Sequence, residues 1–208
     1  MYALVQDNQI TQIIHQPKSI VIGDVRYPAK IFSMWSKAEK EAIGIYEVQT
    51  DSTNLKDTNY YINTNEQFTF ANGIVTRSWG TATAKQLDDS LWTQQDSDNG
   101  ELPNDKEVGD VKVEGLKTQK KRIVKQQAAG LLTPTDWVIV KAKETGTNIP
   151  TATKSWRADV RTKSNEMEAM IDACTTVDQL KALYEYTNTG TEEDPVITRP
   201  LPEFPEAI

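Results

Sequence analysis

The chain has 208 residues, 38% of them hydrophobic and 25% charged, which is enough for one or two domains with a buried core. Its formal net charge of −7 argues against a general nucleic-acid-binding protein, because such proteins need an excess of Lys and Arg to displace counterions from phosphates. The sequence has no apolar run long enough to cross a bilayer and no recognisable signal peptide, so we expect neither membrane insertion nor secretion by that route.

Hairpins dominate the first part of the chain, where we expect a small β-rich domain over residues 1–93. Apolar and polar residues alternate at about 2–6 and 9–14, which is the pattern of two half-buried strands. A second hairpin is expected around Gly23-Asp24. The strongest turn signal is Asn72-Gly73, because it lies between β-forming residues.

The same domain should contain one short helix, at about residues 36–43. Ser36 and Glu39 have the spacing of a capping box, in which each side chain binds the backbone N–H of the other residue. Gly44 follows and favours the end of a helix. With the hairpins on one side of the chain and helices on the other, the fold class predicted for the whole protein is α+β.

Aromatic residues are frequent on the predicted strands. They suggest a ligand groove, for a glycan for example, although ordinary cross-strand and core contacts explain them more simply. A glycan-binding, receptor-type domain is therefore an alternative function. The residues concerned are Tyr46, Tyr60, Tyr61, Phe68, Phe70 and Trp79.

Residues 94–112 predict an acidic linker between two domains. The segment contains Asn99-Gly100 and Pro103 and shows no apolar period. We expect the β-rich domain to end before it and a helical module to begin after it.

Residues 113–187 predict the helical module, a hairpin or small bundle with Trp137 and Trp156 at its seam. Apolar residues recur there at three- and four-residue spacing, which indicates one buried face on each helix. The main positions are Leu116, Ile123, Val124, Ala128, Leu131 and Leu132, then Trp137, Ile139, Val140 and Ala142, then Trp156, Val160, Met167, Met170, Ile171 and Cys174.

Capping signals divide the module into separate helices. Thr133 and Pro134 suit the start of a helix, and Gly146 suits its end. Ile149-Pro150 opens the next helix, and Thr176 to Gln179 has the spacing of a capping box for the last one.

A basic cluster lies on the first helix of this module. Nucleic-acid binding is one interpretation, but the solvated side of an amphipathic helix is simpler, and docking to an acidic protein is the next alternative. The cluster consists of Lys117, Lys120, Lys121, Arg122 and Lys125.

Residues 188–208 form a Pro-rich tail that we expect to be extended. It is either a solvated end or an arm that docks on a neighbouring molecule, since its apolar residues could serve as anchors. Those residues are Val196, Ile197, Leu201, Phe204 and Ile208.

Catalytic patterns are scarce. His15 and Cys174 are the only residues of their types, so zinc sites and the usual nucleophile–base pairs cannot be assembled, and we expect no cofactor and no metal. Cys174 is interpreted as a small buried hydrophobe. A two-carboxylate hydrolase stays open through Asp88-Asp89 or Asp96 with Asp98, but their polar surroundings offer little burial to raise a pKa. We therefore expect a protein that is not an enzyme.

The junction between the first two predicted helices of the module, together with the start of the next helix, resembles a known protein family. Leu131-Leu132-x-x-Thr135-Asp136-Trp137, a short helix, Ile149-Pro150 and then Trp156-Arg157-x-x-Val160-Arg161 resemble the C-terminal region of tail-assembly and tail-fibre-assembly chaperones of tailed bacteriophages. Similar modules occur in virion or tail-fibre components of marine phages. The match covers about a quarter of the chain, and Met1-Tyr2-Ala3-Leu4 also resembles the start of such proteins.

The resemblance implies a non-enzymatic tail protein that acts through protein–protein contacts. It is either a resident tail, baseplate or fibre-attachment component of the virion, or a chaperone in the infected host cytoplasm. Its expected partners are phage tail or tail-fibre proteins, with a homo-oligomer as a further option. The candidate partner-binding residues are Leu131, Leu132, Asp136, Trp137, Trp156, Arg157, Val160, Arg161 and Phe204.

Overall fold

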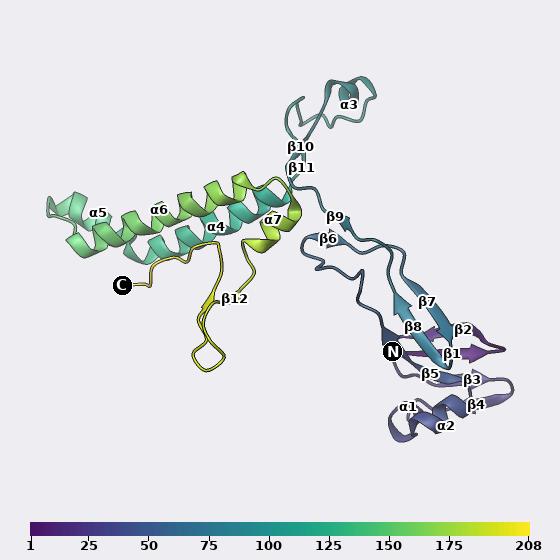
Figure 1. Cartoon of the computed structure of the whole chain (residues 1–208). Coiled ribbons are helices and arrows are strands. Elements are labelled where there is room, and N and C mark those ends of the chain that lie inside the picture. The colour runs from purple at the N-terminus through teal and green to yellow at the C-terminus, as the bar shows by residue number, and fades with distance from the viewer. The chain divides into compact units, whose positions relative to one another are not determined.

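The computed structural model describes residues 1–208 and divides into two compact units, Met1–Ala84 and Lys85–Ile208 (Figure 1). The first unit is rich in strands and the second in helices, so the predicted α+β class is confirmed. The division falls before the segment predicted as a linker, because residues 94–112 belong to the second unit.

A five-stranded sheet forms the centre of the first unit, with strand order β2-β1-β5-β8-β7. Only β5 and β8 pair in parallel; every other neighbouring pair is antiparallel. The strands are β1 (Tyr2–Gln6), β2 (Gln9–Ile14), β5 (Ile45–Thr50), β7 (Gln67–Ala71) and β8 (Ile74–Ser78).

The predicted hairpins are all present. Asn72 and Gly73 both have positive φ, as a tight two-residue turn between β7 and β8 requires. The Gly23-Asp24 turn joins β3 (Ile20–Ile22) to β4 (Val25–Tyr27). A further antiparallel pair joins β6 (Tyr61–Ile62) to β9 (Thr83–Ala84).

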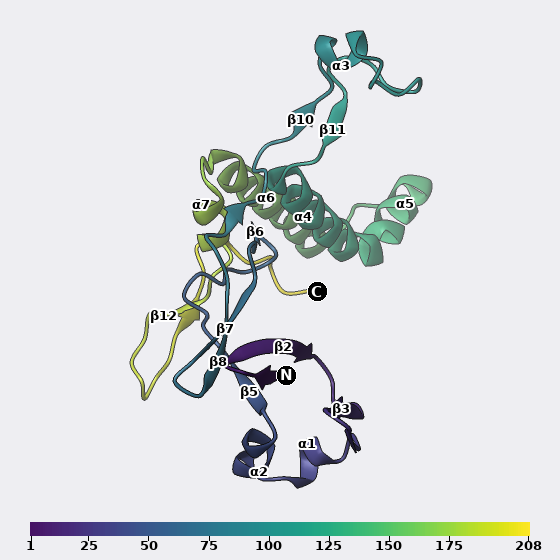
Figure 2. The ribbon, with the colours of Figure 1, turned by 90° about the vertical axis from the view of Figure 1, so that its right-hand side faces the viewer.

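Each face of the sheet contacts a buried core, and successive residues of β1 point alternately to the two cores. Leu4 faces a core that includes Ile31 and Phe32 of α1 (Ile31–Met34), a helix the sequence did not predict. Ala3 and Val5 face a second core, where the edge strands β2 and β7 approach each other as the sheet curls (Figure 2).

The predicted short helix is α2 (Lys37–Ala42), and its capping box is formed. The Glu39 N–H donates to Ser36 Oγ over 3.3 Å, and the Ser36 N–H donates to Glu39 Oε2 over 2.8 Å. Gly44 follows with φ +83°, and its N–H donates to the Glu41 carbonyl over 2.9 Å.

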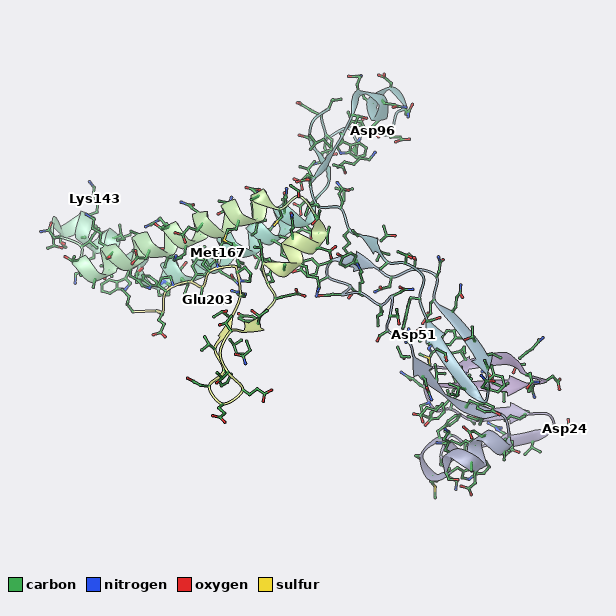
Figure 3. All side chains as sticks on the ribbon, in the orientation of Figure 1. Asp24, Asp51, Asp96, Lys143, Met167 and Glu203 are labelled. Carbon is green, nitrogen blue, oxygen red and sulfur yellow. The ribbon has the colours of Figure 1, made fainter.

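Two long helices, α4 (Leu116–Leu132) and α6 (Thr151–Ala173), lie side by side in the second unit (Figures 1 and 2). A 3₁₀ turn, η1 (Thr133–Thr135), leads from α4 into α5 (Asp136–Thr145), and α7 (Val177–Ala182) follows α6. The seam between α4 and α6 buries Val124, Val160 and Met167, the last labelled in Figure 3. No helix is both long and apolar enough to span a membrane.

Residues 85–115 form a hairpin-based excursion rather than the predicted linker. β10 (Ser90–Leu91) pairs with β11 (Val111–Val113), and α3 (Gln94–Asp98) lies beyond them. A capping box between Thr93 and Asp96 holds α3, and Figure 3 shows Asp96 at the outer part of the excursion. The apolar period is absent because caps and strand pairing, not a buried helix face, hold this segment.

The excursion is tied at its base to the start of α4. Asp89 accepts from the Gly115 N–H over 2.7 Å and from Thr118 Oγ1 over 2.9 Å. The next two amides, of Leu116 and Lys117, donate to the carbonyls of Gln86 and Leu87. These bonds satisfy N–H groups that a helix start otherwise leaves without a partner.

We expect alanine to have opposite effects at two glycines of this helix region. A Cβ at Gly115 would lie 2.4 Å from the Asp88 carbonyl carbon, so Gly115→Ala should lower the free energy of unfolding by about 1–3 kcal/mol. A Cβ at Gly130 meets nothing within 4 Å, so Gly130→Ala should raise it by about 0.5–1 kcal/mol through helix propensity. Denaturant midpoints of the helical circular-dichroism signal would measure both, and equal effects would contradict the close packing at Gly115.

Acid should weaken the excursion through Asp96. The Lys112 ammonium, 2.6 Å away, and hydrogen bonds from Thr93 hold the pKa of Asp96 well below its usual range. A depressed pKa stabilises the folded form fully above the unfolded value of about 4, and this stabilisation is lost as the pH falls through the folded pKa. The protection factor of the Thr93 amide, which is its exchange relative to the unprotected amide at the same pH, should therefore fall in acid, and Asp96→Asn should remove most of that pH dependence.

The Pro-rich tail docks on its own chain. β12 (Thr187–Asn188) pairs with β13 (Ile197–Thr198), and the Leu201 N–H then donates to the Leu183 carbonyl over 3.0 Å. Leu201 is buried, and Phe204 packs against the α4–α6 core. The alternative of a solvated end is thus wrong for residues 199–206, and the anchors Leu201 and Phe204 are used within the molecule.

Candidate protein-interaction site

The motif that carries the phage resemblance builds the end of the helix pair where α4 leads into α5. Its residues divide into two groups with different surroundings. One group, around Arg157 and Trp156, is buried and holds α4, α5, α6 and the tail together. The other, around Trp137, faces solvent on α5.

Arg157 locks the start of α5 onto α6. Its guanidinium donates to the Leu132 carbonyl over 2.8 Å, to Thr135 Oγ1, and to Asp136 Oδ1 over 2.7 Å. The Arg157 side chain is 8% exposed and the Asp136 side chain is 57% exposed. The fork geometry of Arg suits such a set of acceptors, so both candidate residues have a structural role here.

The bonds of Arg157 to Leu132, Thr135 and Asp136, called the Arg157 lock below, accompany a shift in the start of α5. This helix begins at Asp136 and not at the predicted Thr133-Pro134. Thr133 does not cap α5; its hydroxyl donates back to the Ala129 carbonyl, and Thr135 donates to the Leu132 carbonyl. The chain passes through the 3₁₀ turn with Pro134 near its start. Gly146 ends α5 with φ +68°, as predicted.

Trp156 and Val160 are core residues, not exposed partner-binding residues. They are 7% and 0% exposed, and Leu131, Leu132 and Phe204 pack against them. The Trp156 indole N–H donates to the Glu206 carbonyl over 2.7 Å, so the tail covers this ring. Trp156 and Val160 are therefore internal packing residues, whereas Leu131, Leu132 and Phe204 are only half-buried against them, and Leu131 and Phe204 also line an open groove of about 550 Å³.

Arg161 lies outside the lock. It is exposed, and its guanidinium donates to the Arg157 carbonyl over 3.2 Å. It borders a small cavity of about 300 Å³ between α4 and α6, together with Lys125 and Ser164. Among the basic candidates, Arg161 is therefore the one left accessible to a partner.

Trp137 does not lie at a helix seam, contrary to the prediction. It is 61% exposed, and Val140, one turn further along α5, is 55% exposed. The Lys141 ammonium lies 5.7 Å from the centroid of the Trp137 ring. Four consecutive apolar residues, 137–140, are more than one buried face of a short helix can take, so some of them must face solvent.

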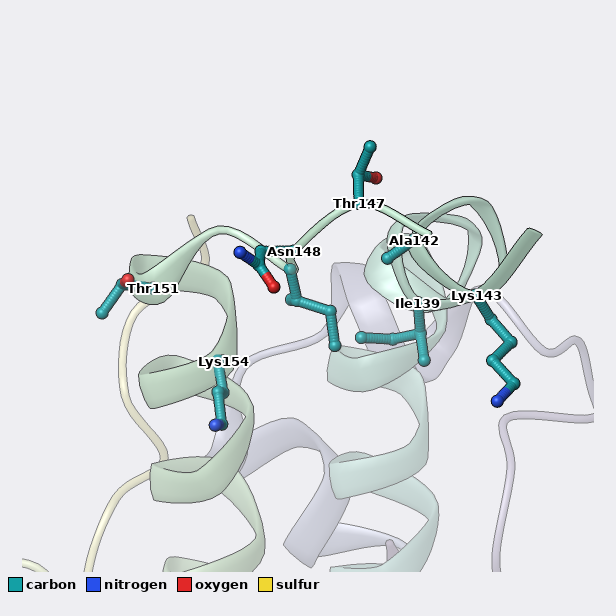
Figure 4. Close-up of a pocket in the computed structure, with 8 residues that line it drawn as sticks. Ile139, Ala142, Lys143, Thr147, Asn148, Thr151 and Lys154 are labelled. Carbon is teal, nitrogen blue, oxygen red and sulfur yellow. The ribbon is translucent and has the colours of Figure 1, made fainter. Parts of the chain in front are cut away.

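A groove of about 590 Å³ lies between α5, the following loop and the start of α6 (Figure 4). Ile139 contributes to it from α5, with Lys143 on the same helix and Lys154 on α6, and no carboxylate lines it. A second cavity of about 310 Å³ borders Trp137 and Lys141. These lysines carry no sequence signal for a site, because they belong to no cluster of like charges along the chain.

The predicted basic cluster on α4 is neutralised within the unit. Lys117 pairs with Asp88 over 2.9 Å, Lys121 with Asp172 over 2.7 Å and Lys125 with Glu168 over 3.2 Å. Arg122 pairs with Glu114, and the Lys120 ammonium lies 4.8 Å from the Tyr184 ring centroid. This pairing removes the charge surplus on which the nucleic-acid interpretation depended.

The other residues considered for catalysis or metal binding either have structural roles or lie apart from one another. Asp89 and Asp96 cap helices, as described above. Burial raises the pKa of the Cys174 thiol, which disfavours the reactive thiolate, although Lys117 acts in the opposite direction. His15 is exposed, and no three His, Cys, Asp or Glu residues are placed to hold a metal ion.

The aromatic residues of the first unit do not gather in one groove. Tyr46 and Phe70 pair within the second core, with ring centroids 4.8 Å apart, and Tyr60 and Tyr61 are buried. The Trp79 ring is covered by Arg77 at 4.5 Å. Their arrangement is that of core and cross-strand contacts.

Comparison of the chain with protein-family models, with curated proteins and with solved structures gives no match. The candidate site therefore rests on its own geometry, which offers exposed apolar side chains beside unpaired cations on a firmly held helix. Such a surface can form protein contacts by burying apolar area and pairing charge.

Proposed function

We propose that the protein is a non-enzymatic tail protein of a tailed bacteriophage and that it acts through protein–protein contacts made by α5. The observation that carries this proposal is the exposure of Trp137, at 61%, on a helix that Arg157 fixes to the core. Large aromatic residues on a rigid element are typical anchors of interfaces. The resemblance of the surrounding motif to tail and tail-fibre assembly modules supplies the phage context.

A resident component of the tail, baseplate or fibre attachment is the form of this function that we favour. The first unit has two hydrophobic cores of its own. A separately folded unit of this kind could bind a second tail protein, which a resident component needs and a chaperone with a single client surface does not. The tail does not bear on this choice, since its anchors Leu201 and Phe204 pack on its own unit. A tail-fibre assembly chaperone is the alternative, and the motif resemblance favours it.

Quantitative mass spectrometry of purified particles of a phage that encodes this chain separates the two forms. A fixed copy number per particle is expected for a resident component. Absence from particles together with abundance in the infected-cell lysate would identify a chaperone. Absence of any association with tail proteins in particle and lysate would contradict the proposed function as a whole.

The role of α5 is tested by two matched valine variants. Val140→Ala should reduce incorporation or partner capture, because Val140 lies one turn from Trp137 on the exposed face. Val113→Ala, at a valine of β11 that is similarly exposed, should leave it unchanged. Trp137→Ala should have the larger effect of the two α5 variants, and incorporation equal to that of the wild type would rule out this face.

A further inference from the structure

Two exposed features of the second unit carry opposite charge and have no partner within the molecule. One is the groove beside α5, with its lysines. The other is the tip of the β12–β13 hairpin, which carries Glu192, Glu193 and Asp194. None of these three carboxylates forms an ion pair, and neither Lys143 nor Lys154 does.

The groove presents cations around an apolar floor. Ile139 lies between Lys154 and Lys143 in Figure 4, and Figure 3 shows Lys143 projecting from α5. The nearest acid in sequence to Trp137, Asp136, is engaged by Arg157, and Glu144 does not line the groove. An occupant of this groove should therefore combine carboxylates with small apolar side chains.

The hairpin has that chemistry on a well-defined turn. Asn188 Oδ1 accepts from the N–H groups of Gly190 and Val196, both over 2.9 Å, and the Thr189 N–H donates to the Val196 carbonyl over 2.8 Å. Beside the three carboxylates, Val196 and Ile197 are 48% and 58% exposed. The turn thus presents acidic and apolar groups with little loss of conformational entropy on binding.

The hairpin does not reach the groove of its own molecule. Both features belong to the second unit, and Figures 1 and 2 agree in placing the hairpin away from α5. The base of the hairpin is held by the bond from Leu201 to Leu183, and α5 is held by Arg157. Contact between the two features therefore requires two molecules.

We infer that the hairpin tip of one copy binds the α5 groove of a second copy of this chain. The contact is head-to-tail, so it generates a ring if the rotation between copies closes and a filament if it does not. Because the pairing is between exposed charges, it should weaken strongly with salt. The inference stands independently of the phage assignment.

Sedimentation velocity of the full chain over a concentration series tests this contact. At low salt the wild type should associate, and high salt should return it towards the monomer. The groove variant Lys143→Glu with Lys154→Glu and the hairpin variant Glu192→Lys with Glu193→Lys should each weaken self-association about tenfold or more. A wild type that stays monomeric at low salt over the whole series would overturn the inference.

Mixing the two variants gives the decisive comparison. The groove variant keeps an acidic hairpin that fits the unchanged groove of the hairpin variant, and the two reversed surfaces also fit each other. The mixture, and a chain carrying all four substitutions, should therefore regain association that each double variant alone has lost. Failure of both to regain it, with native circular dichroism, would refute the contact.

A charge-matched control separates this contact from general repulsion. Lys18 and Lys30 are exposed lysines of the first unit, and Lys18→Glu with Lys30→Glu changes the net charge as the groove variant does. This control should associate like the wild type. If it loses association equally, net charge and not the groove controls assembly, and the inference is wrong.

Discussion

Replacing Trp156 by alanine should lower the free energy of unfolding of the second unit by about 3–5 kcal/mol. The indole ring is 7% exposed and lies where α4, α6 and the tail meet, against Ala128, Val160 and Phe204. Its removal leaves a cavity and also frees the Glu206 carbonyl that accepts the indole N–H. The substitution should therefore loosen the tail as well as the helix pair.

Trp137→Ala is the matched control for this prediction. It removes the same side chain from the same unit, but at a position that is 61% exposed, so the expected change is within about 0.5 kcal/mol. Denaturant unfolding followed by the helical circular-dichroism signal reports on the second unit, since the first unit contains little helix. Similar losses for both variants would show that the two rings are packed alike and would contradict the structure.

Replacing Arg157 by alanine should cost about 2–4 kcal/mol, because it removes a buried cation that serves three acceptors at once. The Leu132 carbonyl would lose its charged donor, and α5 would lose its connection to α6. Arg157→Lys should recover only a small part of the loss, since an ammonium cannot span the same set of acceptors.

The control for Arg157 is its neighbour Arg161. Arg161→Ala removes an exposed guanidinium that reaches only a backbone carbonyl, so we expect a loss below about 1 kcal/mol. A double-mutant cycle with Asp136→Ala would isolate the ion pair, and its coupling energy should be favourable. If Arg157→Ala changed stability no more than Arg161→Ala, the lock would not hold α5 in solution.

Signals that act over a few residues predicted local structure well. Asn72-Gly73 gave its hairpin because both residues adopt positive φ, and Ser36 with Glu39 gave its helix because the two side chains cap each other's backbone. The capping box of Thr93 and Asp96 has the same spacing. It was overlooked because the acidic composition of 94–112 outweighed it in the prediction.

Contacts between residues far apart in the sequence could not be predicted from such local signals. Trp137 and Trp156 occupy similar apolar positions in the sequence, and only the Arg157 lock and the tail decide which ring is covered. The periodicity of a helix identifies a face but not the partner of that face. The same limit applies to the tail, whose anchors Leu201 and Phe204 were recognised while the surface that binds them was not.

The position of the tail contacts has a consequence for synthesis on the ribosome. The first unit is built from residues 1–84 and can complete its cores while the rest of the chain is still being translated. The α4–α6 pair has no such independence, since Phe204 and Glu206 cover Trp156 only after nearly all the chain has emerged. A nascent or prematurely terminated chain would therefore expose Leu131, Leu132 and Trp156 together, and this apolar surface favours aggregation or capture by a holding chaperone of the host.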